Sequence, residues 1–266
     1  MEKNSFRGYS ILGNIAVINF PNGKISKKEK KEFAEKILKT NNSVKTVLEK
    51  SGKFSGRLRK MKTNFLVGEK TKEVLYRENN CVFRFNIDTT YFSPRLSNER
   101  KEVSSMIKSG QEVLVMFAGV APFPIVIAKN SKAKKIYSNE INREANKYTK
   151  LNVELNKLKD RVEIVDGDIK KVTEKLKNSG KKFDVIIMPR PQLKDSFLKQ
   201  AFMLSKKNSL IIYYDFCRVE DREKIIEKIK SEAEKAKKKI KILNVKNAGE
   251  IAPYKTRLRV DFKVLN

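Results

Sequence analysis

Acidic side chains follow two strand-like segments at positions that suit a nucleoside ligand. Glu140 closes KKIYSNE, about 20 residues after Gly119 in MFAGVAPF, and Asp166 and Asp168 close VEIVDGD. A doubly wound sheet binds ligands beyond the carboxyl ends of its strands, where an acidic residue usually holds ribose hydroxyls. One glycine alone is equally consistent with an ordinary α/β turn, and AGVAPF lacks the G-x-G-x-x-G of dinucleotide sites. The three strand ends together favour an adenosine-type ligand without a pyrophosphate, such as S-adenosylmethionine.

A second candidate is the stretch YFSPRLSNER, residues 91–100. It places Arg95 and Glu99 four residues apart, behind a proline and an aromatic pair. On a helix, this spacing is typical of a surface ion pair worth about 0.2–0.5 kcal/mol. The chain contains no histidine, which removes the commonest general base and the commonest metal ligand. Proton transfer near neutral pH therefore needs a different base, and no metal site is expected.

The elements that would position these residues change character along the chain. From about Gly110, apolar strands alternate with helices, which is typical of a mostly parallel sheet covered on both faces. The expected strands are EVLVMFA, AKKIYSNEI, VEIVDGD, FDVIIMP and SLIIYYDF. The expected helices are NREANKYTKLNVELNKL, KKVTEKLKNSG, QLKDSFLKQAFMLS and DREKIIEKIKSEAEKAKKK, followed by an antiparallel edge hairpin of IKILNVKNAG and RLRVDFKVL. The preceding hundred residues are predicted to mix short strands with one helix capped by Ser26.

Composition narrows the class of partner. The 266 residues hold 60 Lys+Arg against 31 Asp+Glu, a formal charge of +29, which favours a polyanion such as nucleic acid. The longest apolar run, residues 113–128, is too short and too interrupted by glycine and proline to span a bilayer. No signal peptide is visible, and Cys81 and Cys217 have no metal-like spacing. We expect a cytoplasmic protein with reduced cysteines and no membrane partner.

Four blocks resemble the Met-10-like tRNA (guanine-37-N1) methyltransferases of archaea and eukaryotes. They are RENNCVFRFNIDTTYFSPRLSNER, MFAGVAPFPIVIAK, IYSNEINREANKYTKLNVELNKL and VEIVDGDIKKV, and SVKTVLEKSGKFSGRLR and APYKTRLRVDFKV fit the same pattern. The resemblance runs from about Gly13 to the C-terminus. It implies a small α+β RNA-binding or substrate domain over residues 1–90. A class I S-adenosylmethionine-dependent methyltransferase domain, Rossmann-like with a mostly parallel sheet, is implied over residues 91–266 with its active-site loop at 91–100.

The resemblance also implies roles for individual residues. Glu99 would be the general base that removes the N1 proton of guanosine 37, with Arg95 orienting the loop or stabilising charge and Arg59 donating to guanine O6. Tyr91 and Phe92 would shape the pocket of the flipped base. The implied cofactor contacts are Phe92, Arg95, Phe117, Gly119, Val120, Glu140, Ile141, Asp168, Ile169 and Pro189, and Tyr91, Arg190 and Pro191 are implied for substrate binding.

The chain departs from the family pattern at three places. Val115 stands where the family usually has Asp, Ala121 replaces a glycine, and Pro189-Arg190-Pro191 replaces Asn-Leu-Pro. A proline cannot offer the side-chain amide of that asparagine, which in the family helps to hold the target base. Arg190 could compensate by contacting phosphate or base.

Three alternatives to guanosine-37 methylation stay open on sequence grounds. They are a wybutosine-pathway aminocarboxypropyl transferase, methylation of another RNA, and an RNA-binding protein that has lost catalysis. The intact PRL...E block argues against the first. The chain also resembles a form without the N-terminal domain that checks the tRNA elbow, and we expect a monomer. Without that domain, we expect charge to dominate tRNA binding and affinity to fall steeply with salt.

Overall fold

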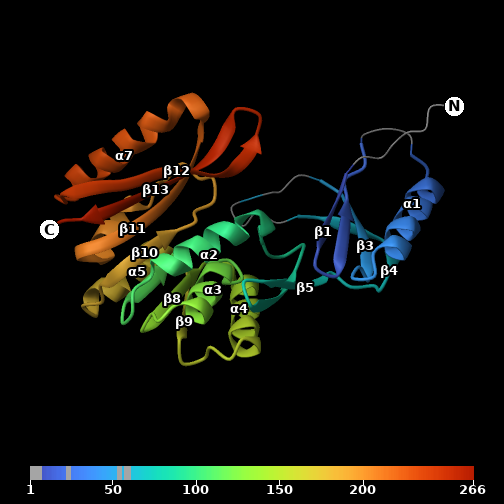
Figure 1. Cartoon of the computed structure of the whole chain (residues 1–266), viewed down its shortest axis with the longest axis horizontal. Helices are drawn as coiled ribbons and strands as arrows, with labels where there is room; N and C mark the ends of the chain where they lie inside the picture. Colours follow the sequence, from blue (N-terminus) through green and yellow to red (C-terminus); the bar gives the residue numbers. More distant parts are fainter. Residues whose placement is uncertain (1–7, 22–24, 53–55, 57–60) are drawn as a thin grey trace. The chain divides into compact units, whose positions relative to one another are not determined.

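The computed structural model describes residues 8–21, 25–52, 56 and 61–266, and its chain divides into two compact units (Figure 1). The small unit comprises residues up to Glu78 together with Val82–Phe92, and the large unit comprises Asn79–Cys81 and Ser93–Asn266. Each unit has its own hydrophobic core. In the described part of the chain, no helix is both long and apolar enough to cross a membrane.

The small unit is a four-stranded sheet with one covering helix and a separate hairpin. The sheet has the order β1-β2-β3-β4, and its elements are β1 (Tyr9–Leu12), β2 (Ile15–Ile18), α1 (Lys27–Thr40), β3 (Thr46–Lys50) and β4 (Thr63–Gly68). The hairpin pairs β5 (Glu73–Glu78) with β6 (Cys81–Asn86). Ser26 caps α1 as expected, since Ser26 and Glu29 form a reciprocal capping box. The apolar face of α1, including Ala34 and Ile37, packs on the sheet.

The large unit is a seven-stranded sheet in the order β12-β13-β11-β10-β7-β8-β9. Its strands are β7 (Glu112–Val115), β8 (Lys135–Glu140), β9 (Val162–Asp166), β10 (Phe183–Met188), β11 (Ser205–Arg218), β12 (Ile240–Ala252) and β13 (Lys255–Val264). Its helices are η1 (Pro94–Leu96), α2 (Ser97–Met106), α3 (Pro122–Asn130), α4 (Arg143–Leu155), α5 (Ile169–Asn178), α6 (Leu198–Leu204), η2 (Val219–Asp221) and α7 (Arg222–Lys235). Strands β7 to β11 pair in parallel, and the predicted β12–β13 hairpin forms the antiparallel edge.

Strand order reverses between β7 and β10, which is where a doubly wound sheet binds its ligands. The apolar faces of α5, α6 and α7 share one core with the sheet, while α2 packs on α3 and α3 packs against β8 (Figure 1). Both faces are therefore covered, as the uniformly apolar strands predicted.

One predicted helix is shorter than its sequence suggests. We expected helix over QLKDSFLKQAFMLS, residues 192–205, but α6 begins only at Leu198, after Phe197 with φ +58°. The carbonyl oxygens of Leu193 and Asp195 accept from the Arg190 guanidinium. Because these carbonyl oxygens bond Arg190, residues 193–195 form a loop, and the helix starts after it.

Candidate active site

The carboxyl ends of β7, β8 and β9 meet at one edge of the sheet, joined by main-chain and side-chain hydrogen bonds. The Glu140 carboxylate accepts the N–H of Gly119 at 2.8 Å with one oxygen and those of Ile141 and Asn142, both at 2.8 Å, with the other. Asp168 caps α5 by accepting the N–H of Lys170 at 3.0 Å. Three strand ends that are far apart in sequence thus present an ordered set of acceptors at the predicted place.

Buried polar side chains that the sequence analysis did not single out support this edge. Asn139 donates to the carbonyl oxygens of Val165 at 2.9 Å and Gly167 at 3.0 Å, which ties β8 to the turn after β9. From α4, Thr149 donates to the Gly119 carbonyl at 3.2 Å and Asn152 to the Val120 carbonyl at 3.1 Å. A polar residue on the buried face of a helix needs a hydrogen-bond partner. The polar residues Thr149 and Asn152 on the buried face of α4 were therefore the available sequence signal for these contacts.

The turn after β7 has a strained backbone. Phe117, Gly119 and Ala121 have φ values of +58°, +60° and +65°. Alanine in this left-handed region costs about 1–2 kcal/mol, so Ala121, which stands where the family pattern has glycine, adds strain to the turn. Phe117 packs edge-to-face on Phe197 with ring centroids 4.9 Å apart, which connects the turn to the start of α6.

The hydrogen-bond acceptors at these strand ends fit the hydroxyl groups of S-adenosylmethionine. Carboxylate oxygens at Glu140 and Asp168 suit hydroxyl donors. Of the apolar residues predicted to contact the cofactor, Ile141 is half-buried, whereas Val120 and Ile169 are buried. The predicted contact Pro189 directly follows β10, on the other side of the switch point. These residues would hold the adenosine part of the cofactor.

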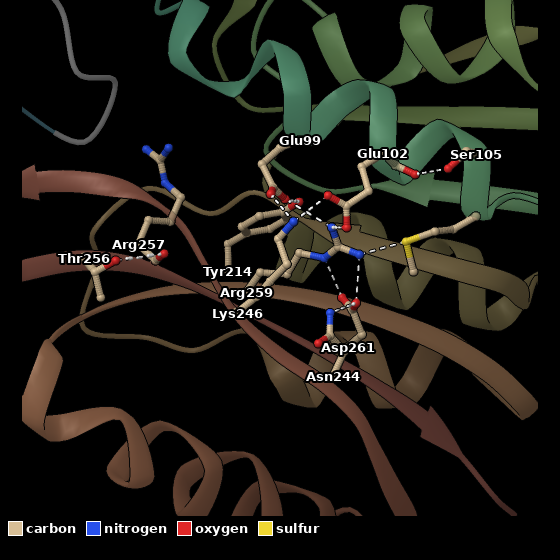
Figure 2. Close-up of polar contacts among 11 residues, drawn as sticks. Glu99, Glu102, Ser105, Tyr214, Asn244, Lys246, Thr256, Arg257, Arg259 and Asp261 are labelled. Atoms are coloured by element: carbon tan, nitrogen blue, oxygen red, sulfur yellow. Dashed lines mark hydrogen bonds and ion pairs between the residues drawn. The ribbon is translucent and has the colours of Figure 1, made fainter.

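Glu99 lies in the first turn of α2 and is buried. Figure 2 shows that one carboxylate oxygen accepts the Tyr214 hydroxyl at 3.0 Å and the Arg259 guanidinium at 3.2 Å. The other oxygen pairs with Lys246 at 2.9 Å. Glu99 therefore receives three donors from β11, β12 and β13, and the expected surface pair with Arg95 is absent from the described residues.

Around Glu99 lies a larger set of charges, the Glu99 network, made of Glu99, Glu102, Lys246, Arg259 and Asp261 with Tyr214. Arg259 binds Asp261 through two nitrogens, both at 2.7 Å, and also donates to Glu102 at 2.8 Å. Lys246 bonds Glu102 as well as Glu99 (Figure 2). In side-chain exposure, Arg259 is at 1%, Glu99 at 10% and Lys246 at 31%, so Lys246 is the cation that solvent reaches.

The environment shifts the pKa values of several members of the Glu99 network. Burial, and then the Glu99 carboxylate, raise the pKa of Tyr214 well above its ordinary value, so Tyr214 is a neutral hydrogen-bond donor. Partial burial on its own lowers the pKa of Lys246, but hydrogen bonds to Glu102 and Glu99 outweigh it and raise the pKa. The hydrogen bond from Lys246 is the main cause of the lowered pKa of Glu102.

The other predicted residues of the 91–100 block do not belong to the Glu99 network. Arg95 is exposed on η1, whereas the neighbouring Arg100 is buried, donates to the Ser93 carbonyl at 3.1 Å and lies over the Phe123 ring at 5.9 Å. Phe92 belongs to the small unit, where it stacks on Phe85 with ring centroids 4.8 Å apart. Tyr91 also belongs to the small unit, and Arg59 lies outside the described residues.

Arg190 is turned into the protein. Its guanidinium pairs with Asp215 and with the carbonyl oxygens of Leu193 and Asp195. Asp215 additionally accepts from the Tyr213 hydroxyl at 2.8 Å and from Lys228 at 3.0 Å. We call Arg190, Asp215, Tyr213 and Lys228 the Arg190 network. For Arg190 to contact phosphate or base, as the sequence analysis suggested, this network would have to open, and Pro191 flanks the same loop.

Together, the doubly wound sheet, its switch point and the aligned strand ends define a class I S-adenosylmethionine-dependent methyltransferase fold with a small α+β domain before it. Residues 74–243 match the TRM5/TYW2 methyltransferase domain, and residues 1–71 match the TYW2 N-terminal domain. The chain belongs to the TRM5/TYW2 methyltransferase family. The predicted family, fold class and methyl donor are thereby confirmed.

Three relatives show how far the similarity extends. The tRNA (guanine(37)-N(1))/4-demethylwyosine(37)-methyltransferase Taw22 of Nanoarchaeum equitans is 32% identical over 304 aligned residues, covering 97% of this chain and 99% of the relative. The crystal structure of Trm5b from Pyrococcus abyssi has a TM-score of 0.85 at 32% identity, covering 98% of this chain and 76% of that one. A complex of aTrm5 with tRNALeu has a TM-score of 0.83 at 28% identity, covering 98% and 72%.

Proposed function

We propose that the chain transfers the methyl group of S-adenosylmethionine to N1 of guanosine 37 in tRNA, with Glu99 as the base. The observation that carries this proposal is the Glu99 carboxylate, buried at the start of α2 within the most family-specific block of the sequence. The Nanoarchaeum relative named for guanine-37 N1 methylation matches nearly the whole chain and supports the same reaction. The structure of a 28% identical relative with tRNALeu bound supports tRNA as the substrate.

The chemistry requires a proton acceptor. Guanine N1 carries a proton at neutral pH, so the N1–H bond must break when the N1–methyl bond forms. Bound S-adenosylmethionine supplies an electrophilic methyl, whose bond electrons stay on sulfur. Glu99 would take the N1 proton on a carboxylate oxygen. As N1 is deprotonated, negative charge develops on O6, where Arg59 and Arg95 remain the proposed stabilising cations.

The contacts of Glu99 suggest how its reactivity is controlled. Both carboxylate oxygens of Glu99 already accept from donors, so a donor must leave before Glu99 can take a proton from guanine. Arg259 is buried and bound to Asp261, whereas Lys246 has a flexible, partly exposed side chain and a second carboxylate partner in Glu102. We therefore expect Lys246 to remain on Glu102 and release Glu99 when guanine enters.

The test is methyl transfer from methyl-labelled S-adenosylmethionine to tRNA transcripts with guanosine or adenosine at position 37. Wild type should methylate only the guanosine transcript, and mass spectrometry should locate the label on N1. Glu99→Gln should lower the single-turnover rate by about 10²–10⁴, because the amide cannot accept the proton. Glu102→Gln, which leaves Lys246 with Glu99 as its remaining carboxylate partner, should lower the rate far less, by about fivefold at most.

Two results would contradict the proposal. Equal transfer to both transcripts would show that guanosine 37 is not the target. A Glu99→Gln rate equal to that of wild type would exclude Glu99 as the base while leaving the substrate assignment intact.

A second candidate is aminocarboxypropyl transfer, and a specific match favours it: residues 1–71 match the TYW2 N-terminal domain. That reaction would move a different carbon of the same cofactor to tRNA. Parallel reactions with methyl-labelled and carboxyl-labelled S-adenosylmethionine separate the two, because only the transferred group brings label to tRNA. The combined name of the Nanoarchaeum relative adds tRNA with 4-demethylwyosine at position 37 as a third substrate to include.

A further inference from the structure

The tip of the β12–β13 hairpin has an unusual residue at its turn. β12 ends at Ala252 and β13 begins at Lys255, so Pro253 and Tyr254 form a two-residue connection. Tyr254 has φ +60°. Proline followed by a positive φ is the pattern of a type II turn, whose third position normally holds glycine or asparagine. A tyrosine there strains the turn, and strain of this kind is often kept for function.

Packing within the chain does not explain this tyrosine. Tyr254 is 83% exposed, the highest value among the exposed large hydrophobic residues of the described chain. Two further exposed apolar residues lie close by: Ile251, next to the last residue of β12, and Val219, at the start of η2. The N–H of Val219 donates to the Tyr254 carbonyl at 3.2 Å, which fixes the backbone of the tip while leaving the ring in solvent. Within the described part of the chain, the tip therefore presents an aromatic ring that is mostly exposed to solvent.

Cations lead from this ring toward Glu99. Lys255, Arg257 and Arg259 alternate along β13 and so share the face that carries the Glu99 contacts. Figure 2 shows Arg257 rising from β13 on the same side as Glu99, and its guanidinium lies 5.2 Å from the Phe216 ring centroid. Arg259 follows Tyr254 by five positions, a distance of about 17 Å along a strand. Acidic residues near the tip are Glu250 and Glu220, and Glu220 pairs with Arg218 at 3.4 Å.

We propose that Tyr254 is a stacking residue for an unpaired base of the anticodon loop, next to the guanosine that enters the active site. An aromatic ring beside a row of cations is the combination that binds single-stranded nucleic acid: bases stack on the ring and the backbone follows the charges. The inference rests on the proposed function in taking tRNA as the RNA. The ring then fixes the register of the loop, so that the base reaching Glu99 is the base at position 37.

The experiment measures binding of the anticodon stem-loop to the full chain by fluorescence anisotropy. Tyr254→Ala should weaken binding about tenfold or more, and Tyr254→Phe should bind within about twofold of wild type, because phenylalanine keeps the ring. Tyr254→Gly is the decisive variant, since glycine relieves the turn. Its thermal stability should equal or exceed that of wild type, yet its binding should fall as in Tyr254→Ala. Leu243→Ala, at another exposed apolar position on β12, should bind like wild type.

Salt dependence separates stacking from simple charge. Tyr254→Ala should leave the slope of log affinity against log salt unchanged, whereas Lys255→Ala should reduce it by about 1. Stem-loops that each carry one abasic site identify the stacked base. Removing that base should weaken binding to wild type and should leave binding to Tyr254→Ala unchanged. Wild-type affinity in both Tyr254→Ala and Tyr254→Gly would overturn the inference and point to a protein partner for the tip. Because binding is measured without cofactor, that result is distinct from a failure of wild type to methylate guanosine 37.

Discussion

Two buried charge networks lie on opposite faces of β11, and they differ in the sign of their charge. Tyr214 points toward α2 and α3 and bonds Glu99, while Tyr213 and Asp215 point toward α7 and bond Lys228 and Arg190. The Glu99 network holds three carboxylates and two cations, from Glu99, Glu102, Asp261, Lys246 and Arg259. The Arg190 network holds one carboxylate and two cations.

Under the proposed function, this difference would separate a network that accepts a proton from one that supports the fold. Asp215 accepts from Arg190, Tyr213, Lys228 and the N–H of Phe216, so its oxygens are occupied by structural donors. In the Glu99 network the carboxylates outnumber the cations, and the most exposed cation is shared between two of them. We infer that β11 carries chemistry on one face and loop anchoring on the other.

Removing Arg190 should produce the largest effect on stability. Arg190→Met leaves Asp215 buried without its main cation and frees two carbonyl oxygens before α6, so the free energy of unfolding should fall by about 3–5 kcal/mol. Urea unfolding measures this. Methyl transfer per folded molecule should fall far less than in Glu99→Gln. Unchanged stability with lost transfer would instead show that Arg190 leaves its network to contact substrate.

The sequence predicted one half of the candidate site better than the other. Glu140 and Asp168 could be found because each follows its own strand, and parallel strands bring their carboxyl ends together whatever the details of register. The partners of Glu99 could not, because Tyr214 and Arg259 are 115 and 160 residues away and reach it only through the order and pairing of β11 and β13. The charged pair Arg259 and Asp261 inside an apolar strand was the one available signal of a buried network.

The predicted length of α6 was wrong for a similar reason. Its sequence is helical in pattern as far back as Gln192, but Arg190 takes the carbonyl oxygens that a longer helix would use. Asp215, the main partner of Arg190, comes from a strand that follows α6, so no local pattern reveals the competition.

Lys246→Met tests whether the exposed cation restrains Glu99. Methionine preserves the apolar stem but removes the charge, leaving Glu99 with Arg259 and Tyr214. Single-turnover methyl transfer near pH 8 should therefore rise by about twofold to fivefold, since the Glu99 oxygen that Lys246 occupies is then open to the guanine proton. Lys228→Met, the matched change in the Arg190 network, should leave the rate unaltered. A large fall in Lys246→Met with normal tRNA binding would show that Lys246 takes part in the reaction itself.

The smallest expected effect is a dependence of stability on pH that belongs to Glu102. The hydrogen bond from Lys246 is the main cause that lowers the pKa of Glu102 below its ordinary 4.5, and Arg259 acts in the same direction against partial burial. A carboxyl whose pKa is lowered on folding contributes stability that is complete above the unfolded pKa and lost as the pH falls through the folded one. Because the side chain is 44% exposed, the contribution should be below about 1 kcal/mol.

Urea unfolding of wild type and Glu102→Gln at pH 7 and at pH 3 measures this contribution. Wild type should be slightly more stable at pH 7, and the difference should shrink at pH 3 because protonated Glu102 no longer pairs with Lys246 or Arg259. Raised salt should reduce the difference at pH 7 while leaving the effect of Arg190→Met largely intact, because the Arg190–Asp215 pair is buried. A difference that persists at pH 3 would mean that Glu102 stabilises α2 through its packing, and that the two networks differ less in their exposed charges than their geometry indicates.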